Sequence, residues 1–393
     1  MNTKKLKLLL CSLMGIAVAA AMVQCTKSEA VSNNIKPDKL AVTAQPAAAL
    51  ATTFVHPGIL NTQASLTQIA SEANANNAER LAAYQKVLDY CNSHSPSNGY
   101  KATISVASSA GTTDETNFKG DALLSYALAL RWAKTGDNNY AVTVKQILDG
   151  WANVFQGIVV TGSNPNPNQG ALEAAWAAPT FAAAAEIIKH FKLPNGQTGG
   201  WTTAEDNQFK SFLNKLKDNY INNTPNYHNN WVVSQGYAKM AIGIFEDSQT
   251  VYNNGLALIK TVIPEIIATD GSMNGEICGH SDYTHFQYSL TGITYAANLA
   301  AMQFNDISVY TASNSRLLAG YNYQYKLIKG TVSPGCNVNG SPSSPIWPGI
   351  EIADRRYHTT ETSFIRNISP PYGLPGGDVG FLGWTSYTHH NVY

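Results

Sequence analysis

Two histidines and a tyrosine lie close together in the segment 280–288, a grouping suited to moving protons. His285 and Tyr288 are three residues apart, so they share one face of a helix that begins there. An imidazole titrates near neutral pH, and a phenol can act as a base once a nearby cation or donors lower its pKa from about 10. We therefore predict that His285 and Tyr288 are catalytic. The plain alternative for Tyr288 is a half-buried core aromatic.

A second polar cluster, residues 226–231, directly precedes a strong helical pattern. An asparagine N-cap explains one amide at this place. It does not explain a histidine with two asparagines beside it. We predict that His228 and Asn229 are catalytic and that Asn230 and Trp231 bind a ligand.

Polar residues elsewhere could contribute to the same site. Asn168 and Gln169 end a proline-containing loop that leads to Trp176 on a helix, where the alternative is an ordinary loop and a core tryptophan. Tyr283 and Lys119 are further predicted binding residues.

Adjacent arginines, Arg355 and Arg356, follow an aromatic segment and could bind carboxylates through the guanidinium fork. The alternative is a solvated charge cluster paired internally with Asp354.

Metal, nucleotide and redox cofactors are not predicted. Cys278, His280, Asp282 and His285 are all metal-ligand types, but their spacing fits no standard zinc pattern. The chain shows no glycine-rich phosphate loop, and 26 basic residues balance 26 acidic ones, so a nucleic-acid partner is not expected.

Helical patterns predict the elements that position these residues. From about 64 to 330 apolar residues recur at helical spacing, and short turns such as Thr135-Gly136-Asp137 separate successive helices. Successive helical hairpins either stack as an open solenoid or close into a toroid, and the absence of a fixed repeat disfavours the solenoid. After about 330 the chain is rich in Gly and Pro, and we expect irregular structure with a few short strands. The predicted helical segments are 123–132, 144–151, 171–191, 204–220, 231–246, 251–268, 285–303 and 309–327.

The N-terminus resembles an export signal. Three lysines precede an apolar stretch, 8–22, that is too short to span a membrane, and Cys25 follows at a position typical of lipoproteins. Ordinary cleavage after the Ala19-Ala20-Ala21 run is the alternative. We expect residues 1–25 to be a signal peptide, 26–55 a flexible tether and 56–393 the catalytic domain. The expected location is the periplasm or the outer membrane, with only a lipid anchor touching the membrane.

Two of the five cysteines, Cys11 and Cys25, lie in the predicted signal peptide. The other three, Cys91, Cys278 and Cys336, are too few for a disulfide framework. One bridge, between Cys278 and Cys336, is compatible with an oxidising compartment, as are three buried thiols.

Residues 115–360 resemble the alginate lyase superfamily of helical-toroid polysaccharide lyases, which includes relatives that cut polyglucuronate. The likeness is carried by His228-Asn229-Asn230-Trp231, by Leu172-Glu173-Ala174-Ala175-Trp176, by the turns 135–137 and 270–272, and by the segment 285–290. It implies an all-α toroid, an anionic polysaccharide substrate, and a proton-transfer tyrosine at Tyr288 with His228 and Asn229 beside it. Two positions depart from the pattern. Tyr227 stands where an asparagine is expected before the histidine, and Ser281 stands where an arginine is common.

The resemblance implies β-elimination at a uronic acid. Amide donors would stabilise the charge that develops on the carboxylate, and Tyr288 or a histidine would transfer the protons. Two alternatives remain. A glycoside hydrolase on a similar toroid would use two of the carboxylates Glu173, Glu276, Asp282 and Glu351, and a glycan-binding surface lipoprotein would bind without turnover.

Overall fold

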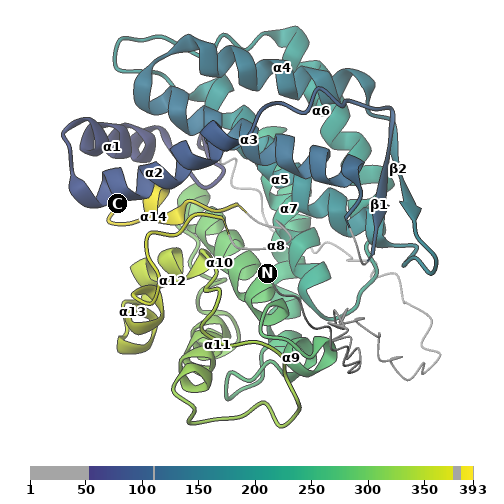
Figure 1. Cartoon of the computed structure of the whole chain (residues 1–393), viewed down its shortest axis with the longest axis vertical. Coiled ribbons are helices and arrows are strands. Elements are labelled where there is room, and N and C mark those ends of the chain that lie inside the picture. The colour runs from purple at the N-terminus through teal and green to yellow at the C-terminus, as the bar shows by residue number, and fades with distance from the viewer. Residues whose placement is uncertain (1–52, 109–110, 375–381, 393) are drawn as a thin grey trace, which may run out of the picture. The chain divides into compact units, whose positions relative to one another are not determined.

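The computed structural model describes residues 53–108, 111–374 and 382–392 (Figure 1). The predicted signal peptide, the lipidation site at Cys25 and most of the predicted tether lie outside these residues. At the end of the tether, Phe54 is already packed against the rings of Tyr252 and Phe304. The packed domain thus begins slightly earlier than the sequence suggested.

The described chain is mainly helical. All eight predicted helical segments lie on helices. Six match the helix ends to within a few residues, whereas 123–132 and 144–151 cover only part of the helices Thr113–Thr135 and Asn138–Val154. The helices are α1 (Gln63–Asn74), α2 (Ala78–Ser93), α3 (Thr113–Thr135), α4 (Asn138–Val154), α5 (Gln169–His190), α6 (Thr203–Asn219), α7 (Asn230–Phe245), α8 (Gln249–Ile266), α9 (Asn274–His280), α10 (His285–Phe304), α11 (Ala312–Ile328), α12 (Gly349–Tyr357), α13 (Thr360–Arg366) and α14 (Thr385–Thr388), with a 3-10 turn, η1 (Ile221–Asn223).

The helices form an inner and an outer layer. The inner helices α3, α5, α7 and α10 are buried on nearly all sides, and each packs against the next along this series. The outer helices α4, α6, α8 and α11 bury only one apolar stripe, as surface helices do. Inner and outer helices alternate along the chain, because each hairpin of the sequence places one member in each layer (Figure 1).

Local signals set the helix ends. The side chain of Thr112 caps α3, Gly136 ends α3 in the left-handed conformation, and Asp137 caps α4 at once. The α7–α8 pair packs closely because Gly236 and Gly255 face each other. A Cβ on Gly255 would lie 2.5 Å from the Gly236 carbonyl oxygen.

Two short strands were not predicted. β1 (Thr103–Ala107) and β2 (Gly157–Thr161) pair in parallel, in register from Thr103 with Gly157 to Ala107 with Thr161. Both are rich in Ile and Val, which favour strands. Each is only five residues long, so alternation gave no clear signal in the sequence.

The segment after 330 is irregular as far as Pro348 and then contains the short helices α12, α13 and α14. Within the described residues of this segment, 331–374 and 382–392, the expected short strands are not found. It returns to the first helices of the chain. The Arg80 guanidinium on α2 donates to the backbone carbonyls of Ser386, Tyr387 and His390.

Among the described residues, α5 alone is long and apolar enough to cross a bilayer, and its apolar stretch is entirely buried in the protein. That burial is typical of a core helix.

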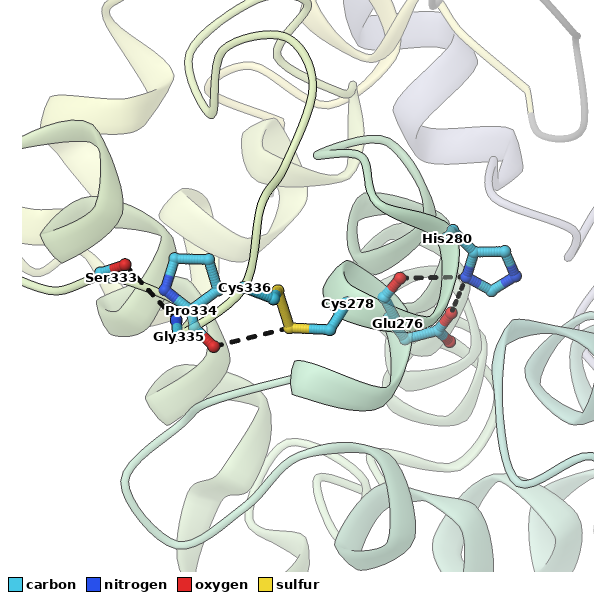
Figure 2. The surroundings of a disulfide bond; sticks show 7 residues. All are labelled: Glu276, Cys278, His280, Ser333, Pro334, Gly335 and Cys336. Carbon is cyan, nitrogen blue, oxygen red and sulfur yellow. Dashed lines mark hydrogen bonds and ion pairs between the residues drawn. A yellow bond between two sulfur atoms is a disulfide. The ribbon is translucent and has the colours of Figure 1, made fainter. Parts of the chain in front are cut away.

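The Cys278–Cys336 bridge, one of the two alternatives that the sequence left open, is present and ties α9 to the irregular segment (Figure 2). Cys91 is a free thiol.

Candidate active site

The first turn of α10 holds the proton-transfer candidates together. Asp282 accepts hydrogen bonds from the backbone N–H groups of Thr284 and His285, so it fixes the start of the helix. Its other carboxylate oxygen lies 2.8 Å from Nδ1 of His285. Burial opposes ionisation of Asp282, but the His285 contact and the backbone donors outweigh it and lower the pKa of Asp282.

His280 and His285 are stacked, with ring centroids 3.6 Å apart and planes 2° from parallel. Ser281, between them, is left-handed with φ 55°, which turns the chain from α9 back toward α10. Burial, followed by the proximity of His285, lowers the pKa of His280. His280 is therefore neutral at neutral pH.

Tyr288 lies between two tryptophans and is 5% exposed. Its ring stacks on Trp176 of α5 at 5.4 Å and meets Trp347 edge-on at 4.2 Å. The His285 ring is 5.6 Å away. The predicted pair His285–Tyr288 therefore shares one helix face, and Trp176 is brought to the same place.

Glu276, which is 2% exposed, connects α9 to the starts of α7 and α10. It accepts hydrogen bonds from the backbone N–H and the side-chain amide of Asn230 and from the Ser289 hydroxyl. His280 Nδ1 lies 3.0 Å from its backbone carbonyl (Figure 2). Burial raises the pKa of Glu276, and the Ser289 and Asn230 hydrogen bonds only partly offset this. Asn230 was predicted to bind substrate, but the structure buries it and directs its amide to Glu276.

The loop before α7 presents His228 and Asn229. His228 has φ 52°, an uncommon backbone conformation for a non-glycine residue. Its imidazole is 59% exposed and lies 3.0 Å from a carboxylate oxygen of Glu265. The side-chain oxygen of Asn229 caps α7 by accepting from the Trp231 N–H. Its Nδ2 group makes no hydrogen bond within the described part of the chain, so it is a donor that substrate can use.

Asn168 and Tyr227 join the loop before α5 to the loop before α7. The Asn168 amide donates to the Tyr227 hydroxyl at 2.9 Å. Tyr227 is 42% exposed and meets Trp231 edge-on at 5.1 Å. The aromatic residue that departs from the family pattern thus presents an exposed ring at the edge of the site.

Lys119 is buried in a charge cluster of α3 and α5. Its ammonium lies 2.8 Å from Glu115 and 2.9 Å from Glu173, and 5.2 Å from the centre of the Trp176 ring. Gln169 donates to Glu173 at 2.7 Å. The two predicted binding residues, Lys119 and Gln169, therefore both bond Glu173, and Lys119 also lies over the Trp176 ring.

Two cavities adjoin this region. One of about 390 Å³ is lined by Lys119, Glu115 and Asn117 of α3, and one of about 440 Å³ by Tyr372, Trp384 and Ile346. Both are bordered by Tyr90 and Leu374, so they meet along one surface. Lys119, which lines the smaller cavity, lies over the ring of Trp176. Ile346, which lines the other cavity, precedes Trp347 in the sequence. Trp176 and Trp347 are the two tryptophans that contact the Tyr288 ring.

The structure does not bring Arg355 and Arg356 to this cluster. Arg355 donates to the side chain of Asn298 at 3.0 Å and to the carbonyl of Val392. Asn298 is ten residues beyond Tyr288 on α10, or about 15 Å along the helix axis. Arg356 lies over the Tyr310 ring. Their guanidinium groups thus contact the C-terminal segment, α10 and the loop before α11.

Tyr283 remains half-buried beside Phe286 at the start of α10. Its carbonyl accepts from Gln287, whose side chain also bonds the backbone of Pro345 and Trp347. Gln287 and Trp347 were not predicted. The sequence carried one signal for Trp347, a Trp-Pro-Gly triplet in a polar segment, but nothing in it indicated contact with Tyr288.

Cys278 is bonded in the disulfide and is therefore not available as a metal ligand in segment 278–285. Three of the four carboxylates considered for a hydrolase are engaged elsewhere: Glu173 with Lys119, Glu276 with Asn230, and Glu351 with Arg366. The fourth, Asp282, bonds His285.

Comparison with known proteins identifies the family. The alginate lyase family profile matches residues 62–333. An alginate lyase from Bacteroides ovatus is 12% identical with a TM-score of 0.63, over 79% of this chain and 95% of that chain. Alginate lyase A1-III from Sphingomonas species A1 is 16% identical with a TM-score of 0.59, over 84% and 97%.

A variant of alginate lyase A1-III complexed with a tetrasaccharide is 14% identical with a TM-score of 0.58, over 84% of this chain and 97% of that chain. No curated protein matches the chain. At these identities the solved structures establish the helical-toroid fold, and the profile match over most of the chain establishes the family. The chain belongs to the alginate lyase family and is a polysaccharide lyase.

Proposed function

We propose that the enzyme cleaves a uronic-acid polymer, alginate or polyglucuronate, by β-elimination and leaves 4,5-unsaturated uronate ends. The observation that carries this proposal is the group Asp282, His285 and Tyr288 at the start of α10, stacked on Trp176. Elimination needs a base for the proton at C5 and an acid for the departing O4, and this group offers an imidazole and a phenol on one helix face.

Asn229 is the donor that we assign to the substrate carboxylate. Its Nδ2 is available, and its position is fixed because its Oδ1 caps α7. A donor held in place stabilises charge that develops on the carboxylate in the transition state without having to reorganise. The exposed His228 on the same loop adds a second donor, and its hydrogen bond to Glu265 keeps the imidazole on this edge.

Asp282 sets the orientation of His285. A neutral imidazole that donates from Nδ1 to a carboxylate carries its lone pair on Nε2. His285 can then accept a proton, or stabilise the ionised form of Tyr288 once it is protonated. The exposed Tyr227 supplies an aromatic surface on which a sugar ring can stack, while the buried Trp176 holds the Tyr288 ring in place.

The proposal is tested by incubating the enzyme with polymannuronate, polyguluronate and polyglucuronate and following the ultraviolet absorbance of unsaturated ends. Tyr288→Phe keeps the ring between Trp176 and Trp347 and deletes the hydroxyl. Tyr325→Phe is the matched control, because Tyr325 of α11 is half-buried against Phe364 of α13. We expect Tyr288→Phe to lose at least about 100-fold in rate and the control to be unaffected. Near-normal turnover by Tyr288→Phe defeats the assignment.

We also propose that the enzyme acts outside the cytoplasm, anchored through a lipid on Cys25. Support comes from the basic and apolar start of the sequence and from the Cys278–Cys336 disulfide, which persists in oxidising compartments. Radiolabelled palmitate should enter the wild-type protein in a bacterial host and should not enter Cys25→Ser. Equal labelling of both proteins contradicts the anchor.

A further inference from the structure

Far from Tyr288, two histidines and a carboxylate converge where the N-terminal strap, which we define as residues 54–60, crosses the end of α5. Within the described residues, the ligand atoms of His56, Glu186 and His190 all lie within 4.8 Å of one another. Glu186 is fully buried, and the His56 and His190 rings stack at 4.3 Å. Nothing in the elimination chemistry uses these groups. Glu186 is ten residues beyond Trp176, or about 15 Å along α5.

We propose that His56, Glu186 and His190 form a binding site for a divalent transition metal such as Zn²⁺. Two imidazoles and one carboxylate are a donor set that zinc prefers, with a fourth position left for water. Glu186 and His190 are four residues apart on α5, so they project from one helix face.

The spacing of the donor atoms fits such an ion. Tetrahedral zinc with bonds of about 2.0–2.1 Å needs ligand atoms roughly 3.3 Å apart. His56 Nδ1 lies 2.9 Å from Oε2 and 3.1 Å from Oε1 of Glu186. His190 Nε2 lies 3.6 Å from Oε1 of the same carboxylate. The His56 and His190 rings are 19° from parallel, so one imidazole must rotate out of the stack to turn its lone pair toward the ion.

The surroundings orient the ligands as they do in metal sites. Asp247 lies 3.1 Å from Nε2 of His56, which fixes that ring so that Nδ1 faces Glu186. Carboxylates that bond the outer nitrogen of a ligating histidine are a common second layer. The Gly58 N–H donates to Glu186 at 2.9 Å and holds its carboxylate.

The Nε2 atom of His190 is the part of the cluster that most strongly indicates metal binding. This atom is buried and makes no hydrogen bond with any described residue. If the cluster served only to hold the strap by hydrogen bonds, Nε2 of His190 would remain buried without a partner. A buried polar atom without a partner lowers the stability of the folded protein.

The ion would fasten the strap to the domain. The strap also bonds Gln303 of α10 through Val55 and Gly58, and His56 reaches Asp247 in the α7–α8 turn. A metal at His56 thus closes contacts between chain segments more than 100 residues apart.

The test is calorimetric titration of the full-length protein, stripped with EDTA, with Zn²⁺. We expect one ion per chain and a rise of about 3 to 6 °C in the unfolding midpoint at a hundredfold excess over Kd. Co²⁺ in place of Zn²⁺ should show the visible absorption of a tetrahedral site.

His190→Gln should weaken binding at least tenfold and remove the Co²⁺ absorption. His358→Asn, at an exposed histidine outside the cluster, should bind as the wild type does. His56→Gln, which leaves α5 intact, serves the same purpose should His190→Gln fail to fold. Absence of saturable binding by the wild type overturns the proposal, and so does unchanged affinity in the ligand variants.

Discussion

Nδ1 of His285 lies 2.8 Å from Oδ2 of Asp282, and the other oxygen of this carboxylate caps the helix on which His285 stands. One side chain thus fixes both the backbone that carries the histidine and the tautomer of its ring. The arrangement is local, since the two residues are three apart, and it leaves the His285 ring 5.6 Å from the Tyr288 ring.

Asp282→Asn should separate these two roles. An asparagine still caps α10, because its side-chain oxygen can accept from the same N–H groups. The negative charge that orients and stabilises the His285 proton is lost. We expect kcat to fall on the order of 10- to 100-fold with little change in the unfolding midpoint, measured by initial rates and circular dichroism. Asp270→Asn, in an exposed turn that accepts from Ser272, is the control. Equal rates for the two variants would show that the carboxylate charge is not needed.

Asn229 combines a helix cap with a substrate donor, and substitution can remove one without the other. Asn229→Ser keeps the cap oxygen and deletes the Nδ2 group. Asn229→Asp keeps the cap and places a negative charge against the uronate carboxylate. We expect both variants to fold normally, Asn229→Ser to lose about 10- to 100-fold in kcat/KM, and Asn229→Asp to lose more. Steady-state kinetics on the preferred uronan give the ranking, and a more active Asp variant would refute the assigned contact.

Burial of Glu276 makes stability depend on pH in a defined direction. Its pKa is raised in the folded protein, so the stabilisation that it contributes is present below its unfolded pKa of about 4.5 and is lost as pH rises through the folded pKa. Glu276→Gln has no charge to bury, and a rotated Asn230 amide can satisfy the new side chain. The wild type should therefore lose stability relative to Glu276→Gln between pH 4.5 and neutrality.

Urea unfolding across that pH range measures the difference. Glu276→Ala provides the contrast, because it leaves the buried Asn230 and Ser289 donors without an acceptor at a cost of about 1–3 kcal/mol. A constant difference between wild type and Glu276→Gln at all pH values would contradict the raised pKa.

The sequence predicted the helices well because their signals are local. The Thr135-Gly136-Asp137 turn and the apolar spacing fix α3 and α4 without knowledge of the rest. Neighbours on one helix, such as His285 and Tyr288, were predicted for the same reason. The placement of Arg355 failed because its partner, Asn298, is 57 residues away and no pattern in the chain marks the pair.

Long-range pairs explain the other surprises as well. Glu276 was one of four carboxylates considered for hydrolysis, and only the fold shows that it serves Asn230, 46 residues earlier. In the described part of the chain, β1 and β2 form a two-stranded sheet with each other. Their pairing is a long-range contact, which the sequence of either strand alone does not indicate. Trp347 meets the Tyr288 ring edge-on and donates its backbone N–H to Gln287, 60 residues earlier.

The Cys278–Cys336 disulfide closes a loop of 58 residues around α10 and α11. Closing a loop of that length limits the unfolded chain and is worth roughly 4 kcal/mol on the chain-entropy account. Cys278 lies two residues from both Glu276 and His280, so the bond also restrains the short helix that carries them (Figure 2). Cys278→Ser with Cys336→Ser should lower the free energy of unfolding by about that amount and reduce kcat, because Glu276 and His280 lose their fixed positions. Urea unfolding and initial rates under non-reducing conditions measure both. Cys91→Ser, at the free thiol, is the control and should change neither. A double variant that is less stable but fully active would show that α9 keeps its place through Asn230 and Ser289 alone.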